Sequence, residues 1–213
     1  MPKTKVFIPM QRHLFFFRHG QTAWNVSNIM QGHSDIPLNE TGIAQAHVLS
    51  SQLQDKHLEI IVSSDSARAR QTAEIVATYC GVPVVCTPAL REIYAGDFEG
   101  VQLDSVIQTP LWAEIFNITP PYAHVSFPHG ETKAEVLDRA SAYITTFLAT
   151  TTYTHIGVAT HDLVVRLLLY KFTGVDTRGL SNAEWVHVTY DTRTHVWHIK
   201  NIEEYRKEVD FET

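Results

Sequence analysis

Two arginines, two histidines and one glutamate have the types and positions to carry out a reaction: Arg18, His19, Arg68, Glu92 and His161. The two guanidiniums offer planar arrays of N–H donors that match phosphate or carboxylate oxygens. A neutral imidazole nitrogen can attack phosphorus, and a second, protonated imidazole can add a donor. A carboxylic acid can protonate a leaving oxygen. Together these groups could transfer a phosphoryl group without a metal ion, because their positive charges do the work that Mg²⁺ does elsewhere.

Strands and helices that alternate along the chain must bring these groups together. Buried strands are predicted at 14–17, 58–63, 83–87 and 155–159, helices at 39–56, 66–79, 131–150 and 162–172, and a hairpin at 184–200. This order predicts an α/β fold, a three-layer α/β/α sandwich with a mostly parallel sheet. Ligands of such sheets bind beyond the carboxyl ends of the strands. All five side chains follow predicted strands, so we expect them to meet at that edge.

The length of 213 residues suits one compact domain, to which we assign residues 1–213. Residues 93–130 are less regular and rich in proline, with one short helix predicted at 111–116. We interpret this stretch as a lid or cap excursion over the site. Met10 precedes the first strand and could itself start translation, which would make residues 1–9 dispensable.

Composition and charge narrow the class of protein. The chain has 17 Lys and Arg against 23 Asp and Glu, a formal charge of −6, so a dedicated nucleic-acid partner is not expected. No apolar run approaches the length of about 20 residues that spans a bilayer, so no membrane partner is expected either. The first ten residues contain no secretory apolar core, which makes the cytoplasm the default compartment.

No metal site is predicted, although the chain contains 12 histidines. It has no His-Glu-x-x-His motif, and Cys80 and Cys86 have no partners at zinc-finger spacing. The histidines other than His19 and His161 are therefore interpreted as structural. His33 is the one to watch, because it directly follows Gln31 and Gly32 near the expected site.

Five sequence blocks, in order, resemble the histidine phosphatase superfamily and its phosphoglycerate mutase-like branch. The first is Arg-His-Gly-Gln-Thr-Ala-Trp-Asn at 18–25, which resembles the family's Arg-His-Gly-x-Thr-x-x-Asn loop. The others lie at 31–38, 63–73, 90–100 and 130–132, the last with Arg139, and His161 stands where the second histidine is expected. The similarity spans residues 12–190.

The resemblance implies a covalent phosphohistidine mechanism and no cofactor. His19 would attack phosphorus while a backbone carbonyl holds its other ring nitrogen. Three side chains would clamp the phosphate oxygens, namely Arg18, Arg68 and His161. Neighbouring substrate contacts would come from Asn25, Gln31 and Gly32. Glu92 would protonate the ester oxygen and then help to activate water, a role that requires a raised pKa.

The resemblance leaves a second candidate acid. Asp162 follows the second histidine, where the mutase-like branch commonly has glycine and the acid-phosphatase branch uses an aspartate as proton donor. Since the loop around Glu92 matches the mutase-like branch, we favour Glu92. Asp162 could instead cap the helix that begins there.

Three functions are compared. A phosphomonoester hydrolase is favoured over a cofactor-dependent phosphoglycerate mutase, because mutases carry extra basic residues between the acid and the next helix. This chain has no Arg or Lys from Phe98 to Glu131, and the segment carries apolar side chains instead. The expected partner is therefore a small, singly phosphorylated metabolite with an apolar body. A non-catalytic phospho-ligand or protein-binding module on the same fold is the third reading, and the edge of the 184–200 hairpin hints at a homodimer.

Overall fold

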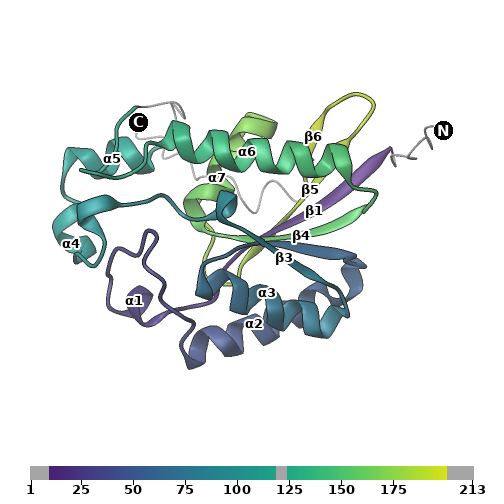
Figure 1. The fold of residues 1–213 in the computed structure, drawn as a ribbon, viewed down its shortest axis with the longest axis horizontal. Helices are drawn as coiled ribbons and strands as arrows, with labels where there is room; N and C mark the ends of the chain where they lie inside the picture. The colour runs from purple at the N-terminus through teal and green to yellow at the C-terminus, as the bar shows by residue number, and fades with distance from the viewer. Residues whose placement is uncertain (1–9, 119–123, 201–213) are drawn as a thin grey trace, which may run out of the picture.

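The computed structural model describes residues 10–118 and 124–200 of the chain, so the arm predicted at residues 1–9 lies outside the described residues. Figure 1 shows a central twisted sheet with helices above and below it. The six strands lie in the order β3-β2-β4-β1-β5-β6. Their bounds are β1 Gln11–Arg18, β2 Ile60–Ser64, β3 Val84–Thr87, β4 His155–Thr160, β5 Trp185–Asp191 and β6 Trp197–Ile199.

The sheet is mostly parallel, as predicted. The pairs β1–β4, β2–β4 and β2–β3 are parallel, and only β5 runs against its neighbours β1 and β6. The predicted hairpin is therefore present as β5 and β6. Strand β6 stands at one edge of the sheet, and the homodimer remains a prediction.

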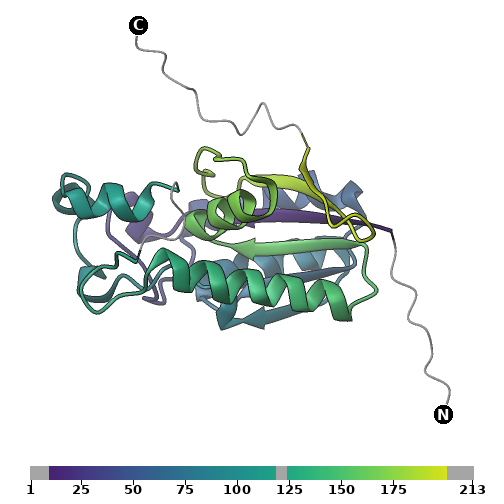
Figure 2. The same cartoon turned by 90° about the horizontal axis from the view of Figure 1, so that it is seen from above.

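Alternation within β1 explains the three layers. Leu14 and Phe16 belong to one core cluster, whereas Phe15 and Phe17 belong to the other, because successive strand residues point to opposite faces. Helices α2 (Glu40–Leu53) and α3 (Ala67–Cys80) cover the second cluster, and α6 (Lys133–Thr150) and α7 (Asp162–Thr173) cover the first. Figure 2, turned by 90°, shows the same layers from above. The predicted α/β/α sandwich is confirmed.

Local signals set the helix ends where the sequence placed them. Asn39 caps α2 by accepting a hydrogen bond from the amide of Gly42 at 2.7 Å. Gly81 ends α3 in the left-handed region at φ 69°. None of the described helices is long and apolar enough to cross a membrane.

The excursion after β3 contains more helix than predicted. The helix expected at 111–116 is α5 (Pro110–Phe116). A further helix of a single turn, α4 (Leu103–Val106), precedes it. Another four-residue helix, α1 (Ala23–Val26), follows β1. One turn is too short to show a hydrophobic period, so neither α1 nor α4 could be predicted. Figure 1 shows α4 and α5 beyond the carboxyl ends of the parallel strands.

Candidate active site

A cavity of about 190 Å³ opens between the carboxyl ends of the strands and the segment with α4 and α5. It is lined by every side chain or backbone position that the sequence singled out: Arg18, His19, Asn25, Gln31, Gly32, Arg68, Glu92, His161 and Asp162. A larger groove of about 720 Å³ lies between α2 and residues 181–185. Amide and apolar side chains dominate that groove, which lacks the cations that phosphate requires.

His19 follows the last residue of β1 and is buried. Its Nδ1 lies 2.7 Å from the carbonyl oxygen of Gly20. Because a carbonyl only accepts, Nδ1 carries the proton and Nε2 keeps its lone pair. Burial lowers the pKa of His19 well below its usual value, and the charges of Arg68 and Arg18 act in the same direction. The imidazole is therefore neutral at physiological pH, as a nucleophile must be.

The backbone around His19 is fixed from several sides. Its carbonyl accepts hydrogen bonds from the amide of Ala183 and from Nδ2 of Asn182, both at 3.1 Å. The amide of Gly20 donates to Oγ1 of Thr72 at 3.0 Å. Gly20 itself allows a close approach, since a Cβ there would lie 2.5 Å from the carbonyl oxygen of Gly42 on α2. The catalytic loop is thus packed directly against the start of α2.

Two arginines approach the pocket with donors to spare. Arg18 donates from Nη1 to the carbonyl of Leu180 at 2.7 Å. Arg68 is buried, and its Nη1 and Nη2 donate to the carbonyls of Ser34 and Gly32 at 2.9 and 2.8 Å. Burial lowers the pKa of Arg68 to about 10, so it remains charged at neutral pH. The buried Nε atom of each arginine has no hydrogen-bond partner among the described residues, which suits both to a bound anion.

His161 stands beside His19, with ring centroids 5.2 Å apart. Its Nε2 lies 3.0 Å from Oγ of Ser64, and its buried Nδ1 has no hydrogen-bond partner within the described part of the chain. Burial lowers the pKa of His161 well below its usual value, and the nearby Arg68 adds to this. The second histidine was expected to be protonated beside a phosphate dianion, whereas burial and the nearby positive charges by themselves favour its neutral form. A phosphate dianion would act in the opposite direction and favour the protonated form.

Glu92 lies partly buried in the loop after β3. Its Oε1 accepts a hydrogen bond from the amide of Ile93 at 2.9 Å. Burial raises the pKa of Glu92, the Ile93 amide opposes this, and the negative charge of Asp162 raises the pKa further. A carboxyl group that keeps its proton more readily than usual is suited to general-acid chemistry.

Asp162 does not cap α7, so that expectation was wrong. The N-cap residue is His161, and Asp162 is the first residue of the helix. Its Oδ1 accepts a hydrogen bond from the amide of Leu180 at 2.6 Å, in the loop that follows its own helix. Because the carbonyl of Leu180 in turn accepts from Arg18, Asp162 braces the segment that orients this arginine.

Two of the three expected substrate contacts, Asn25 and Gln31, lie beside Thr22. Its Oγ1 lies 3.0 Å from both Oδ1 of Asn25 and Oε1 of Gln31. Since both amide oxygens face Thr22, their NH₂ groups are the donors that remain for a ligand. Gly32 lines the pocket with its backbone at φ 52°, and its carbonyl holds Arg68.

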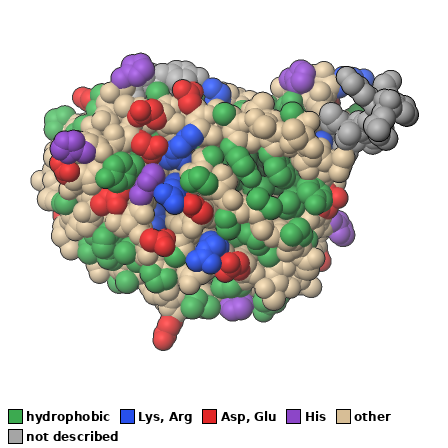
Figure 3. Space-filling view, viewed as in Figure 1, with side chains coloured by type: hydrophobic (Ala, Val, Ile, Leu, Met, Phe, Trp, Pro, Cys, Tyr) green, Lys and Arg blue, Asp and Glu red, His purple; other side chains and the backbone are tan. Residues whose placement is uncertain are grey.

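The rest of the pocket wall is apolar: Ile29, Met30, Ile93, Leu103, Trp112, Phe116 and Leu163. Trp112 and Phe116 stack with ring centroids 3.9 Å apart on α5. Among the described residues that line the pocket, the positively charged lysine or arginine side chains are those of Arg18 and Arg68. Figure 3 shows the positive, acidic and histidine side chains gathered left of centre on the face viewed as in Figure 1, whereas hydrophobic side chains spread to the right.

Sequence reasoning missed several residues that support the site. Asn182, Thr72 and Ser64 hold the two histidines or the backbone beside them. Ser64 and Thr72 belong to the block at 63–73, so the resemblance included them without giving them a role, whereas nothing in the local sequence marks Asn182. Glu99 accepts hydrogen bonds from the amide of His33 at 2.6 Å and from Oγ of Ser34 at 2.7 Å, which ties the loop under Arg68 to the cap. Glu99 belongs to the block at 90–100, so the resemblance pointed to this residue but did not assign it a role.

The arrangement can bind a phosphate dianion, attack it with Nε2 of His19 and protonate a leaving oxygen from Glu92. The described residues include no group of three or more His, Cys, Asp or Glu placed to hold a metal ion. The fixed positive charges of Arg18 and Arg68 are positioned to stabilise negative charge that develops on phosphorus oxygens.

Comparisons with known proteins agree with this geometry. A sequence model of the histidine phosphatase superfamily (branch 1) matches residues 14–203. The probable phosphoglycerate mutase GpmB of Yersinia pestis (strain Pestoides F) is 32% identical over 163 residues, which cover 76% of this chain and 75% of the relative.

Solved structures share the fold over most of the chain. Mycobacterial glucosyl-3-phosphoglycerate phosphatase Rv2419c, in complex with VO3, matches with a TM-score of 0.76 and 26% identity over 89% of this chain and 97% of that chain. Bacillus stearothermophilus YhfR matches with a TM-score of 0.75 and 30% identity over 88% of this chain and 95% of that chain.

Proposed function

The chain belongs to branch 1 of the histidine phosphatase superfamily, and we propose that it is a metal-independent phosphomonoester hydrolase that forms a phosphohistidine on His19. One observation carries the proposal. His19 is neutral, donates from Nδ1 to the Gly20 carbonyl and shares a pocket with Arg18, Arg68 and Glu92. The solved structure of a relative named as a phosphatase supports the same reaction class.

In the first step, Nε2 of His19 attacks phosphorus and the bond from phosphorus to the ester oxygen breaks. Glu92 gives its proton to that oxygen, and the alcohol leaves. In the second step, Glu92 takes a proton from water, whose oxygen attacks phosphorus. The bond to Nε2 then breaks and inorganic phosphate leaves. Arg18, Arg68 and His161 hold the non-bridging oxygens throughout, and Asn25 and Gln31 supply neighbouring amide donors.

The pocket wall favours a singly phosphorylated substrate with an apolar body. Trp112 and Phe116 would contact that body, because both line the cavity beside the phosphate-binding groups. Within the single domain that we propose for residues 1–213, residues 93–130 act as the cap that carries this wall. The partner is accordingly a small phosphorylated metabolite.

A phosphoglycerate mutase is the second candidate, because relatives such as the Yersinia protein are named as probable mutases. A mutase must also bind the carboxylate of its substrate and a second phosphate. The described pocket wall offers apolar side chains where such groups would need cations. This observation favours hydrolysis.

The test is phosphate release from a panel of phosphomonoesters in EDTA, with an isomerisation assay on 3-phosphoglycerate run alongside. Turnover in EDTA by the native protein, lost in His19→Ala, would support the proposal, as would an acid-labile phosphoenzyme absent from that variant. Arg70→Ala is a control, because Arg70 is exposed and, among the described residues, forms its ion pair with Glu74 on its own helix. Isomerisation without net release would favour the mutase, and phosphate binding without turnover would favour the binding module.

A further inference from the structure

The loop that carries Glu92 follows a single 3-10 turn at Pro88–Leu90, and side chains of other elements hold its backbone carbonyls. Four consecutive carbonyls, those of residues 89–92, all accept hydrogen bonds from side chains of other elements. Thr160 at the end of β4 donates to Leu90 at 2.7 Å. Arg139 on α6 donates to the other three, Ala89, Arg91 and Glu92, at 2.9, 2.7 and 2.8 Å.

Arg139 uses every donor that it has. A guanidinium has five N–H groups, and the two not spent on these carbonyls are bound by Glu131. Nε donates to Oε1 of Glu131 and Nη2 donates to Oε2, both at 2.9 Å. This bidentate pair fixes the plane of the guanidinium, so the positions of three carbonyls follow from it. The side chains of both residues are only about a fifth exposed, which limits screening by water.

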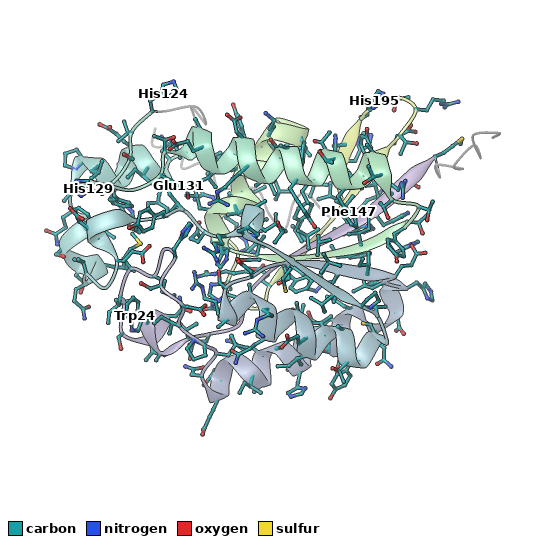
Figure 4. The ribbon with its side chains drawn as sticks, viewed as in Figure 1. Trp24, His124, His129, Glu131, Phe147 and His195 are labelled. Atoms are coloured by element: carbon teal, nitrogen blue, oxygen red, sulfur yellow. The ribbon has the colours of Figure 1, made fainter. Side chains whose placement is uncertain are left out.

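Glu131 also contacts the loop directly. Its Oε2 accepts a hydrogen bond from the amide of Tyr94 at 2.9 Å, and its own amide donates to the Tyr94 carbonyl at 2.8 Å. Burial acts to raise the pKa of Glu131, but the hydrogen bonds from Arg139 and Tyr94 hold it below its usual value, so the carboxylate stays charged. Figure 4 shows Glu131 at the start of α6, where the chain returns from the cap.

His33 binds the same backbone from the opposite loop. Its Nε2 donates to the carbonyl of Glu92 at 2.9 Å and lies 3.6 Å from Oε2 of Glu131. Glu92 therefore has its carbonyl held twice, by Arg139 and by His33. Its carboxyl group, in contrast, accepts one hydrogen bond from the described residues, which comes from the adjacent Ile93 amide of the same loop. The direction in which the carboxyl points depends on where this stretch of backbone is held.

We propose that Arg139 and Glu131 are positioning residues for proton transfer by Glu92, an inference that rests on the proposed hydrolysis. Neither residue lines the pocket. They act by fixing the loop from which the acid reaches the ester oxygen. A displacement of about 1 Å of a reacting group costs about 10²-fold in rate, so loosening this clamp weakens the acid step specifically.

The experiment compares two esters that share an aromatic body and differ in their leaving group. The p-nitrophenolate of p-nitrophenyl phosphate leaves without a proton, whereas the alkoxide of benzyl phosphate requires one. We expect Glu92→Gln to lower kcat/KM for benzyl phosphate by about 10²–10⁴-fold and to change kcat/KM for the nitrophenyl ester far less. The constant kcat/KM is compared because it reports the steps up to release of the alcohol, and not the later activation of water by Glu92 that both esters share. Arg139→Lys and Glu131→Gln should show the same asymmetry, with benzyl phosphate losing about 10–10²-fold in kcat/KM.

Matched controls separate positioning from folding. Arg70→Lys removes an exposed guanidinium of an i,i+4 pair and should leave the ratio of the two rates unchanged. Glu131→Gln keeps the size of the side chain and one acceptor oxygen, so it can test the proposal if Arg139→Lys fails to fold. Equal losses with both esters in Arg139→Lys and Glu131→Gln would overturn the positioning role alone. Absence of hydrolysis by the native protein would instead overturn the proposed function together with this inference.

Discussion

Replacing Gly42 with alanine sets helix propensity against tertiary packing. Gly42 lies in the first turn of α2, where alanine should stabilise the helix by about 0.5–1 kcal/mol. A Cβ at this position, however, would lie 2.0 Å from the carbonyl oxygen of Gln21 and 2.8 Å from its amide nitrogen. Real Cβ atoms stay beyond 3.0 Å, so the catalytic loop and α2 must separate by about 1 Å.

The magnitudes decide the outcome. Overpacking of this kind costs about 1–3 kcal/mol, which exceeds the gain in propensity. We therefore expect Gly42→Ala to lower the free energy of unfolding by about 1–2 kcal/mol in urea denaturation. Gln21 lies two residues beyond His19, the nucleophile that we propose, so kcat/KM for an aryl phosphate should fall by about 10²-fold.

The control is Thr41→Ala, the exposed neighbour on the same turn, which raises helix propensity without a new contact. It should leave kcat/KM unchanged and hold or raise the stability. If Gly42→Ala proved as stable and as active as Thr41→Ala, the close packing of α2 on the catalytic loop would not govern the position of His19, and the reasoning would fail.

Three further outcomes follow from the site. The free energy of unfolding should decrease as the pH falls below about 6.5. The reason is that the pKa values of His19 and His161 are lowered in the folded state, so the unfolded chain binds protons at a higher pH than the folded protein does. Thermal unfolding between pH 5 and 8 checks this, and a flat profile would contradict it. Trp112→Ala should raise KM for p-nitrophenyl phosphate about tenfold through lost apolar contact and leave the inhibition constant of inorganic phosphate unchanged, and a change in that constant would place Trp112 at the phosphate instead. Asp162→Asn should slow p-nitrophenyl phosphate through the lost brace on Leu180, and it should slow benzyl phosphate more, because the Asp162 charge also raises the pKa of Glu92. A loss confined to benzyl phosphate and as large as that of Glu92→Gln would make Asp162 the acid in place of Glu92.

Much of the fold followed from local patterns. The buried strands, the long helices and the caps at Asn39 and Gly81 were predicted within a few residues, because hydrophobic period and capping chemistry involve neighbours in the chain. The one-turn helices α1 and α4 were missed because four residues carry no period. The capping role expected of Asp162 was wrong, since its partner Leu180 lies 18 residues away across a loop.

The sequence by itself determined that the five side chains that follow strands meet, because strand ends in a parallel sheet converge on one edge, and all five are found in the cavity wall. The resemblance added Asn25, Gln31 and Gly32, which line the same cavity. Only the tertiary structure decided the protonation state of each side chain and the groups that surround it. The protonated nitrogen of His19 depends on the Gly20 carbonyl, and the low pKa values of both histidines depend on burial beside two guanidiniums. The clamp of Arg139 and Glu131 on the Glu92 loop joins segments about 50 residues apart, and such contacts arise only when helix α6 packs beside the end of the sheet.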